Sequence, residues 1–300
     1  MYENITDMPI LAIIIPCYNE ELIIKHCASE ITPILKQMIE KNEISDKSYF
    51  CFVDDGSSDC TWNVISELSN GNNHIKGIRL AYNFGQQQAF RCGMVENNAD
   101  IYITIDCDLQ DDITIIPLMV EKYKKNNVDV VYTVRSNRDT DSFPKKFFAD
   151  VFYNTYSVFG IRALKNSADF KLVSRKVVDI LKQFKECNVY LRGLIYTLGL
   201  NYDIICYRRQ PRILGFTKFT LGKQLELAVN GITSLSIMPI RYISLFGIFV
   251  IICGFIKSSD IFLIGGINLL AIGIIGEYIG TIAVETRNRP KWIISERKNY

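Results

Sequence analysis

Asp106 and Asp108 stand one residue apart, directly after an apolar run at residues 101–105. Side chains alternate along an extended chain, so these two carboxylates project to the same side. Oxygen ligands at this spacing suit Mg²⁺ or Mn²⁺, whose other positions would go to water and diphosphate oxygens. Such an ion neutralises the charge that develops on a nucleoside-diphosphate leaving group. A solvated acidic turn is the alternative, whereas an EF-hand calcium loop is excluded because its twelfth position would be Pro117 instead of glutamate.

A second acidic cluster follows the apolar run at residues 49–53 and reads Asp54-Asp55-Gly56-Ser57-Ser58-Asp59. One interpretation is an acidic turn in which Asp59 caps the next helix. The other is a nucleotide site in which a carboxylate binds the base or the ribose. A dinucleotide-binding fold and a P-loop nucleotidase are disfavoured, because no G-x-G-x-x-G follows a predicted strand and no G-x-x-x-x-G-K-[ST] is present.

The segments that position these clusters alternate between strand-like and helix-like patterns. Strands are predicted at residues 11–15, 49–53, 75–80, 101–105, 128–134 and 202–207, and helices at residues 20–41, 60–68, 86–97, 113–125 and 176–184. Pro33 is expected to kink or break the first helix. The alternation predicts an α/β fold with a Rossmann-like, mostly parallel sheet. Because ligands collect at the carboxyl ends of such strands, the clusters at 19–20, 54–55 and 106–108 should converge on one edge.

The composition excludes several classes of protein. The chain has 34 basic and 32 acidic residues, so its net charge gives no reason to expect nucleic-acid binding. It has nine cysteines without a C-x-x-C pair and only two histidines, which favours reduced thiols in a cytosolic compartment over zinc sites or disulfides. The apolar run at residues 10–15 is too short for a signal peptide.

The last third of the chain is mainly apolar and predicts attachment to a membrane. Segments at about 238–256 and 261–284 are expected to form a transmembrane hairpin, because a span needs roughly 20 apolar residues. An amphipathic juxtamembrane helix is expected at residues 216–237. Basic residues flank the hairpin, which predicts a multi-pass protein of the inner membrane with its catalytic domain on the cytoplasmic side. A buried helical pair in a water-soluble core is the alternative.

Several stretches together resemble a known family, the family 2 inverting glycosyltransferases of GT-A fold. They are Ile15-Pro16-Cys17-Tyr18-Asn19-Glu20-Glu21, Val53-Asp54-Asp55-Gly56-Ser57-Ser58-Asp59, Asn83-Phe84-Gly85 and Asp106-Cys107-Asp108-Leu109-Gln110-Asp111. Later stretches resemble its polyprenyl-phosphate branch, above all the bactoprenol glucosyltransferases and more distantly the dolichol-phosphate mannose synthases. They are Ala168-Asp169-Phe170-Lys171-Leu172, Arg212-Ile213-Leu214-Gly215-Phe216-Thr217-Lys218-Phe219, Asn230-Gly231-Ile232-Thr233-Ser234 and Gly276-Glu277-Tyr278-Ile279-Gly280.

The resemblance implies a role for each matching residue. Residues 1–215 would form the catalytic domain and residues 285–300 a basic tail. The nucleotide-sugar site would contain Pro16, Tyr18, Glu20, Asp54, Asp55 and Asp106, and the metal ligands would be Asp106, Asp108 and Gln110. Donor or acceptor phosphates would be held by cations that could otherwise be solvated surface residues, namely Arg135, Lys146 and Lys218. The catalytic residues would be Asp108 and Asp169, the second of which matches the family's proposed base.

The implied reaction moves a hexose, with glucose from UDP-glucose as the leading choice, to undecaprenyl phosphate or another polyprenyl phosphate. The product would serve cell-surface glycan modification of the O-antigen kind, and a homotetramer is expected. A lipid phosphate is already an anion near pH 7, since its second pKa is about 6, so Asp169 is either a base or a positioning group. A family 2 transferase with a saccharide acceptor and a non-catalytic nucleotide-sugar-binding membrane subunit are the alternatives.

Overall fold

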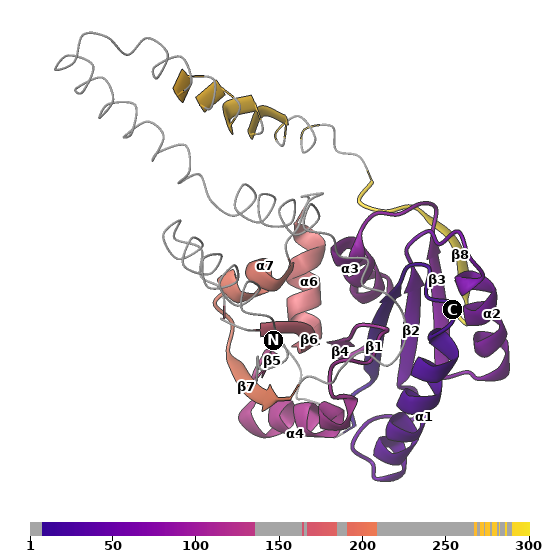
Figure 1. Ribbon diagram of the computed structural model, residues 1–300. Helices are drawn as coiled ribbons and strands as arrows, with labels where there is room; N and C mark the ends of the chain where they lie inside the picture. Colours follow the sequence, from indigo (N-terminus) through magenta and orange to yellow (C-terminus); the bar gives the residue numbers. More distant parts are fainter. Residues whose placement is uncertain are drawn as a thin grey trace, which may run out of the picture.

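An eight-stranded sheet runs through the computed structural model, which describes residues 8–135, 164, 167–184, 191–208 and 290–300 and scattered positions between 267 and 286. Its strand order is β7-β5-β6-β4-β1-β2-β3-β8 (Figure 1). The strands are β1 (Leu11–Cys17), β2 (Tyr49–Asp54), β3 (Ile75–Leu80), β4 (Ile101–Thr104), β5 (Val130–Arg135), β6 (Ser167–Ser174), β7 (Tyr202–Tyr207) and β8 (Ile294–Lys298). Only β6 and β8 run against the other described strands, so the prediction of a mostly parallel α/β sheet is confirmed.

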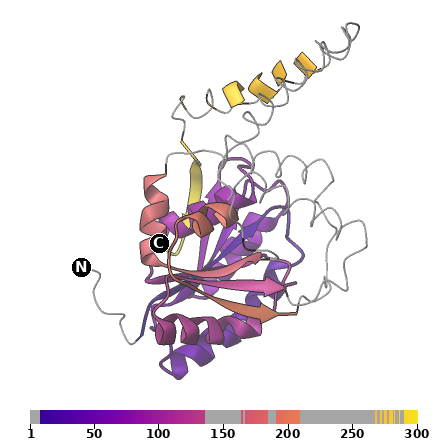
Figure 2. The same ribbon diagram turned by 90° about the vertical axis from the view of Figure 1, so that its left-hand side faces the viewer.

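Helices cover both faces of the sheet (Figure 2). One face packs against α1, α2 and α4, and the other against α3, α6 and α7. The helices are α1 (Ile24–Glu40), α2 (Thr61–Gly71), α3 (Gln86–Glu96), α4 (Ile116–Asn126), α6 (Arg175–Gln183) and α7 (Leu191–Thr197), with a short 3₁₀ turn, η1 (Ile113–Ile115), before α4. This arrangement of a sheet between two helical layers follows from apolar side chains on both faces of the central strands.

Strand β1 shows why its sequence is apolar without alternation. Ile13 and Ile15 point into the core on the side of α1, whereas Ala12 and Ile14 point into the core on the side of α3. Gly93 of α3 packs directly on this strand, because a Cβ at that position would lie 2.2 Å from the Ile14 Cγ2 atom. The close approach of α3 holds its first turn near the carboxyl end of β1.

The first helix begins later than predicted, and Pro33 does not break it. It begins at Ile24 and continues through Pro33 to Glu40 without a break. Just before this helix, the backbone N–H groups of Glu20 and Glu21 donate to the side chains of Thr61 and Asp59.

Strands β6 and β8 and helix α7 were not predicted. The β6 segment is almost wholly buried between β4 and β5, and the β8 segment Ile294–Lys298 pairs with the outer edge of β3. The predicted basic tail at residues 285–300 therefore contains a strand of the main sheet. Strand β8 has a neighbouring strand on one side only among the described residues. A strand at the edge of a sheet can be polar, so its sequence gives little indication of a strand.

The predicted multi-pass location in the inner membrane is wrong. No helix within the described ranges is both long enough and apolar enough to cross a bilayer. Without the extensions past Arg241 and Glu277, the uncharged runs at 243–256 and 261–275 each fall short of the roughly 20 residues that a span needs. Residues 216–256 of the predicted amphipathic helix and first span lie outside the described residues, and the second span is described only at scattered positions.

Candidate active site at the carboxyl edge of the sheet

The acidic clusters meet at one edge because the strands before them are parallel neighbours. Cys17 at the end of β1 pairs in register with Asp54 at the end of β2, and Ile14 pairs with Thr104 at the end of β4. Strand β6 runs the other way beside β4, so its first residues, including Asp169, also lie at this edge. The predicted convergence of the three loops is therefore confirmed, and β6 adds a fourth acidic group.

Asp106 lies among other carboxylates. The pKa of Asp106 is raised to about 8, chiefly by burial and then by the negative charges of Asp111, Asp169 and Asp108, while Arg135 opposes them. The Gln86 side chain donates a hydrogen bond from Nε2 to Asp106 Oδ1 at 2.6 Å. A group of carboxylates that raise one another's pKa favours a bound cation or a bound proton.

The loop that carries these carboxylates has an unusual backbone. Leu109 adopts a left-handed φ of 50° although its side chain is almost fully buried. The Gln110 N–H donates to Asp108 Oδ1 at 3.2 Å, which fixes that carboxylate at the turn. Non-glycine residues with this backbone conformation cost free energy and often occur at functional sites.

The donor set at this edge fits a hard divalent cation. Asp106 and Asp108 offer carboxylate oxygens, which suit Mg²⁺ or Mn²⁺. Across the described ranges, no three histidine, cysteine or acidic side chains converge closely enough to hold a metal ion by themselves. A cation held by Asp106 and Asp108 would complete its coordination with other oxygens, such as those of water or a diphosphate.

Asp111 belongs to a separate contact that anchors the same loop. Its Oδ1 atom lies 3.5 Å from Arg135 Nη2 and accepts a hydrogen bond from the Tyr207 hydroxyl. Arg135 Nε in turn donates to the Tyr207 oxygen at 3.3 Å. Arg135, a predicted phosphate ligand, thus lies beside the acidic loop and pairs with it, at the shared edge of β5 and β7.

Asp169 lies at the mouth of a small pocket. Its carboxylate accepts a hydrogen bond from Gln87 Nε2 at 3.5 Å and lies 3.8 Å from the buried Lys171 ammonium group. The pocket has both polar and apolar side chains in its lining, which is Gln87, Phe90, Met94, Thr104, Asp169, Lys171, Leu191 and Ile195. The Gln87 hydrogen bond and the Lys171 charge together hold the Asp169 carboxylate at this pocket.

Asp55 shapes the loop between β3 and α3. Its two carboxylate oxygens accept the backbone N–H groups of Phe84 at 2.7 Å and Gly85 at 2.9 Å. Burial raises the pKa of Asp55 to about 6 in spite of these bonds. Gly56 permits the close approach, because its φ is +69° and a Cβ would lie 2.4 Å from the Tyr82 carbonyl carbon.

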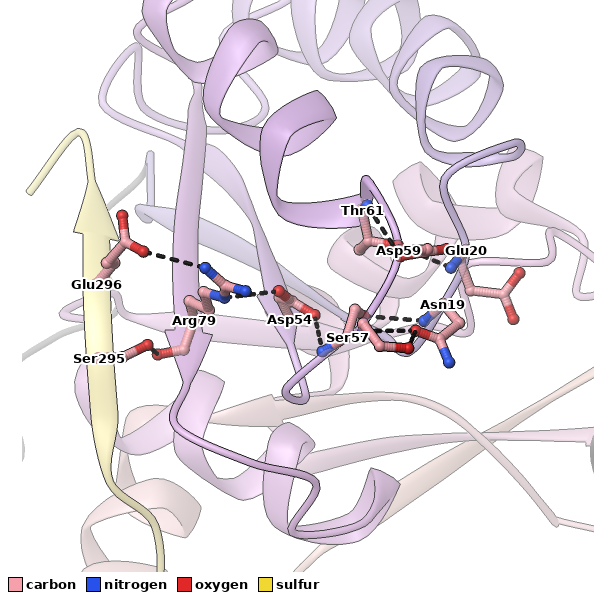
Figure 3. A network of polar contacts seen from close by, with 10 residues as sticks. Asn19, Glu20, Asp54, Ser57, Asp59, Thr61, Arg79, Ser295 and Glu296 are labelled. Carbon is pink, nitrogen blue, oxygen red and sulfur yellow. Dashed lines mark hydrogen bonds and ion pairs between the residues drawn. The ribbon is translucent and has the colours of Figure 1, made fainter.

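Asp54 ties the β2 loop to the β1 loop (Figure 3). The Ser57 N–H donates to Asp54 Oδ1 at 3.0 Å, and Ser57 Oγ accepts the Asn19 N–H at 2.9 Å. Thr61 Oγ1 accepts the Glu20 N–H at 2.9 Å. Asp54 and Asp55 are both buried, so their side chains position the surrounding loops and present little surface to a ligand.

The remaining predicted residues have varied environments. Pro16 is buried within β1, whereas Tyr18 is exposed and Glu20 half-buried directly after that strand. Lys146 and Lys218 lie outside the described residues.

Gln86 and Gln87 at the start of α3 were not predicted as site residues, although they contact Asp106 and Asp169. The signal for them is their position, since they follow Asn83-Phe84-Gly85 at a helix N-terminus.

Comparison with known proteins identifies the family. Residues 12–180 match the model described as "Glycosyl transferase family 2". The glycosyltransferase YkoT of Bacillus subtilis (strain 168) is 38% identical over 95% of this chain and 91% of its own length. A bactoprenol glucosyl transferase of Shigella phage SfX is 32% identical over 96% of this chain and 99% of its own length.

Solved structures share the fold at low identity. Glucosyl-3-phosphoglycerate synthase from Mycobacterium tuberculosis, crystallised with Mn²⁺, UDP-glucose and phosphoglyceric acid, is 15% identical with a TM-score of 0.50, over 76% of this chain and 78% of that one. A mycobacterial protein is 14% identical with a TM-score of 0.52, over 76% of this chain and 74% of that one. With its parallel sheet, the acidic loops at one edge and the family match over more than half of its length, this chain belongs to the family 2 glycosyltransferases and has a GT-A-like fold.

Proposed function

We propose that this glycosyltransferase moves a hexose, glucose from UDP-glucose in the first instance, onto a polyprenyl phosphate with the help of Mg²⁺ or Mn²⁺. The observation that carries the proposal is the set of carboxylates around Asp106, whose pKa is raised to about 8. The acceptor follows from relatives named bactoprenol glucosyl transferase, which match nearly the whole chain. The choice of donor and metal is supported by the fold neighbour that was crystallised with Mn²⁺ and UDP-glucose.

In this proposal two sets of residues bind the two parts of the donor, its nucleoside and its diphosphate. The loops after β1 and β2, which carry Tyr18 and Glu20 and are held by the buried Asp54, bind the base and ribose. Asp106, Asp108 and Gln110 face the diphosphate. A divalent cation, when bound there, stabilises the negative charge of the departing nucleoside diphosphate. Asp111, held by Arg135 and Tyr207, keeps the acidic loop in place.

Asp169 is the proposed residue at the reacting sugar. Its carboxylate is held between Gln87 and Lys171, which favours one orientation. An acceptor phosphate is already an anion near pH 7, since its second pKa is about 6, so the chief task of Asp169 is to position the acceptor or sugar hydroxyls. Direct displacement at the anomeric carbon would invert its configuration.

The test uses the purified chain with undecaprenyl phosphate in detergent micelles. Labelled UDP-glucose, UDP-N-acetylglucosamine and GDP-mannose are supplied separately, each with Mn²⁺, Mg²⁺ or EDTA. We expect labelled lipid with one nucleotide-sugar, dependent on the metal and absent in Asp108→Ala. Transfer to free glycans but not to the lipid would contradict the acceptor, and full activity in EDTA would contradict the metal. Nucleotide binding without any transfer would support a non-catalytic subunit instead.

A further inference from the structure

Arg79 lies between two carboxylates from distant parts of the chain (Figure 3). Its Nε atom lies 3.5 Å from Asp54 Oδ2, and its Nη1 atom donates to Glu296 Oε1 at 3.2 Å. Asp54 ends β2, Arg79 is on β3 and Glu296 is on β8, and these strands are neighbours in the sheet. The charges therefore form a row that runs from the outer strand to the loops of the proposed nucleotide site.

Asp54 depends on the cation beside it. Its side chain is fully buried, and Oδ2 has no hydrogen-bond partner within the described part of the chain. A buried carboxylate oxygen is costly unless a positive charge compensates for its lost hydration. Burial raises the pKa of Asp54, whereas the Ser57 hydrogen bonds and the Arg79 charge act in the other direction. The position of Arg79 therefore affects the strength of the hydrogen bond between the Asp54 carboxylate and Ser57. Through Ser57 it also affects the Asn19 backbone.

Residues of the C-terminal segment hold Arg79 in that position. The Arg79 side chain is 34% exposed, so water competes for its guanidinium group. Glu296 is its register partner across the antiparallel β3–β8 pair, and Ser295 Oγ donates to the Arg79 carbonyl at 3.1 Å. The Trp62 side chain of α2 and the Arg79 guanidinium both lower the pKa of Glu296, which favours its charged form. Cross-strand charged pairs of this kind restrict both side chains.

We propose that Glu296 is a positioning residue for the donor nucleotide, acting through Arg79 on Asp54 and on the Ser57–Asn19 contact. This inference rests on the proposed function, which has the nucleotide bound by the loops after β1 and β2. Glu296 touches no reacting atom, and its effect is on donor affinity. The C-terminal strand is thereby part of the donor site, although it is more than 200 residues away from these loops along the chain.

The test measures nucleotide binding by the full chain. UDP and GDP are titrated calorimetrically in the presence of Mn²⁺, and the nucleotide that binds more tightly is used for all variants. We expect Glu296→Gln to raise the Kd by about fivefold, the scale of coupling between residues in contact. In transfer assays the donor KM should rise while kcat stays within about twofold, because only positioning of the nucleotide is weakened.

A double-mutant cycle shows whether Glu296 acts through Arg79. Arg79→Gln alone should weaken binding at least as much as Glu296→Gln, and the double variant should be no weaker than Arg79→Gln. The matched control is Arg297→Gln. Arg297 is the residue next to Glu296 in β8, and the substitution removes its ion pair with Glu96. It should leave the Kd unchanged.

Three outcomes would overturn the inference. Equal loss of affinity in Glu296→Gln and Arg297→Gln would show a general effect of strand docking, and additive effects of the Glu296 and Arg79 substitutions would remove the link between them. An unchanged Kd in Glu296→Gln, with a wild-type chain that binds nucleotide and transfers sugar, would refute the positioning role alone. A wild-type chain that binds neither nucleotide would refute the proposed function as well. Glu296→Asp, with its shorter carboxylate, should restore part of the affinity.

Discussion

Carboxylates at the carboxyl edge of the sheet are compensated by positive charge to different degrees on its two sides. On the β2–β3–β8 side, buried Asp54 faces Arg79, which also pairs with Glu296. On the β4–β6 side, Asp106 is surrounded by Asp108, Asp111 and Asp169, and its pKa is raised to about 8. The first arrangement stabilises the folded loops as they are, whereas the second contains repulsion that a cation would relieve. The balance of charge thus distinguishes the β2–β3–β8 side, which holds the loops, from the β4–β6 side, which is proposed to hold the metal and diphosphate.

The largest expected effect comes from removing a carboxylate on the β4–β6 side. Asp108→Ala should lower sugar transfer by at least about 100-fold, the scale of losing one group that stabilises charge in a transition state. Rates are measured with saturating donor and metal, and circular dichroism confirms the fold. Asp112→Asn is the matched control, since Asp112 caps the η1 turn and asparagine is also a good cap. Equal losses in both variants would show that the loop, and not the Asp108 charge, is what matters.

The raised pKa of Asp106, caused by burial and by the neighbouring carboxylates, predicts that the stability of the fold depends on pH. Asp106 keeps its proton in the folded protein up to about pH 8, but an unfolded aspartate loses it near pH 4, so the stability of the metal-free chain falls between these pH values. Asp106→Asn should therefore raise the free energy of unfolding by about 1 kcal/mol or more at pH 8, and by little near pH 4. Urea unfolding in EDTA at several pH values measures the difference. A constant difference across this range would contradict the raised pKa.

The anchor of the acidic loop should have a moderate effect. Tyr207→Phe removes the hydroxyl that donates to Asp111 and accepts from Arg135, which should cost about 1–2 kcal/mol of unfolding free energy. Denaturant unfolding provides the measurement. Tyr202→Phe, at the exposed start of the same strand, is the control and should change stability little. A stability loss of the same size in the control would point to the strand instead of the hydrogen bond.

The smallest effect is expected from the partly exposed ion pair at the C-terminal strand. Arg297→Ala removes the contact to Glu96 Oε2 at 2.6 Å, and because both side chains reach water, the cost should be below about 1 kcal/mol. The difference between wild type and variant should shrink further in 1 M salt, where the Debye length is about 3 Å. A loss of several kcal/mol would mean that the compensated side of the sheet depends on this residue more than its exposure indicates.

The strands in the central half of the sheet could be predicted from the sequence, because each is marked by its own local run of apolar residues. Uninterrupted apolar runs such as residues 11–15 are typical of strands buried on both faces, and β1, β2, β3 and β4 were all found at the predicted places. Acidic clusters directly after these strands predicted a common edge, since parallel strands end on the same side. The helix that was expected from residue 20 began at Ile24, and the N–H groups of Glu20 and Glu21 before it bond to side chains about 40 residues further on, which the local sequence does not show.

Only the tertiary structure decided which charges meet and which are compensated. Strand β6 brings Asp169 beside Asp106, and β8 brings Glu296 to Arg79 across 217 positions of the chain. Neither strand has a local pattern that shows its partner, because a pairing between distant segments depends on shape and burial that form only when the sheet is complete. The residue types and their order therefore determined the family and the acidic edge, whereas the raised pKa of Asp106 and the row from Glu296 to Asp54 arise from contacts between segments that the sequence keeps far apart.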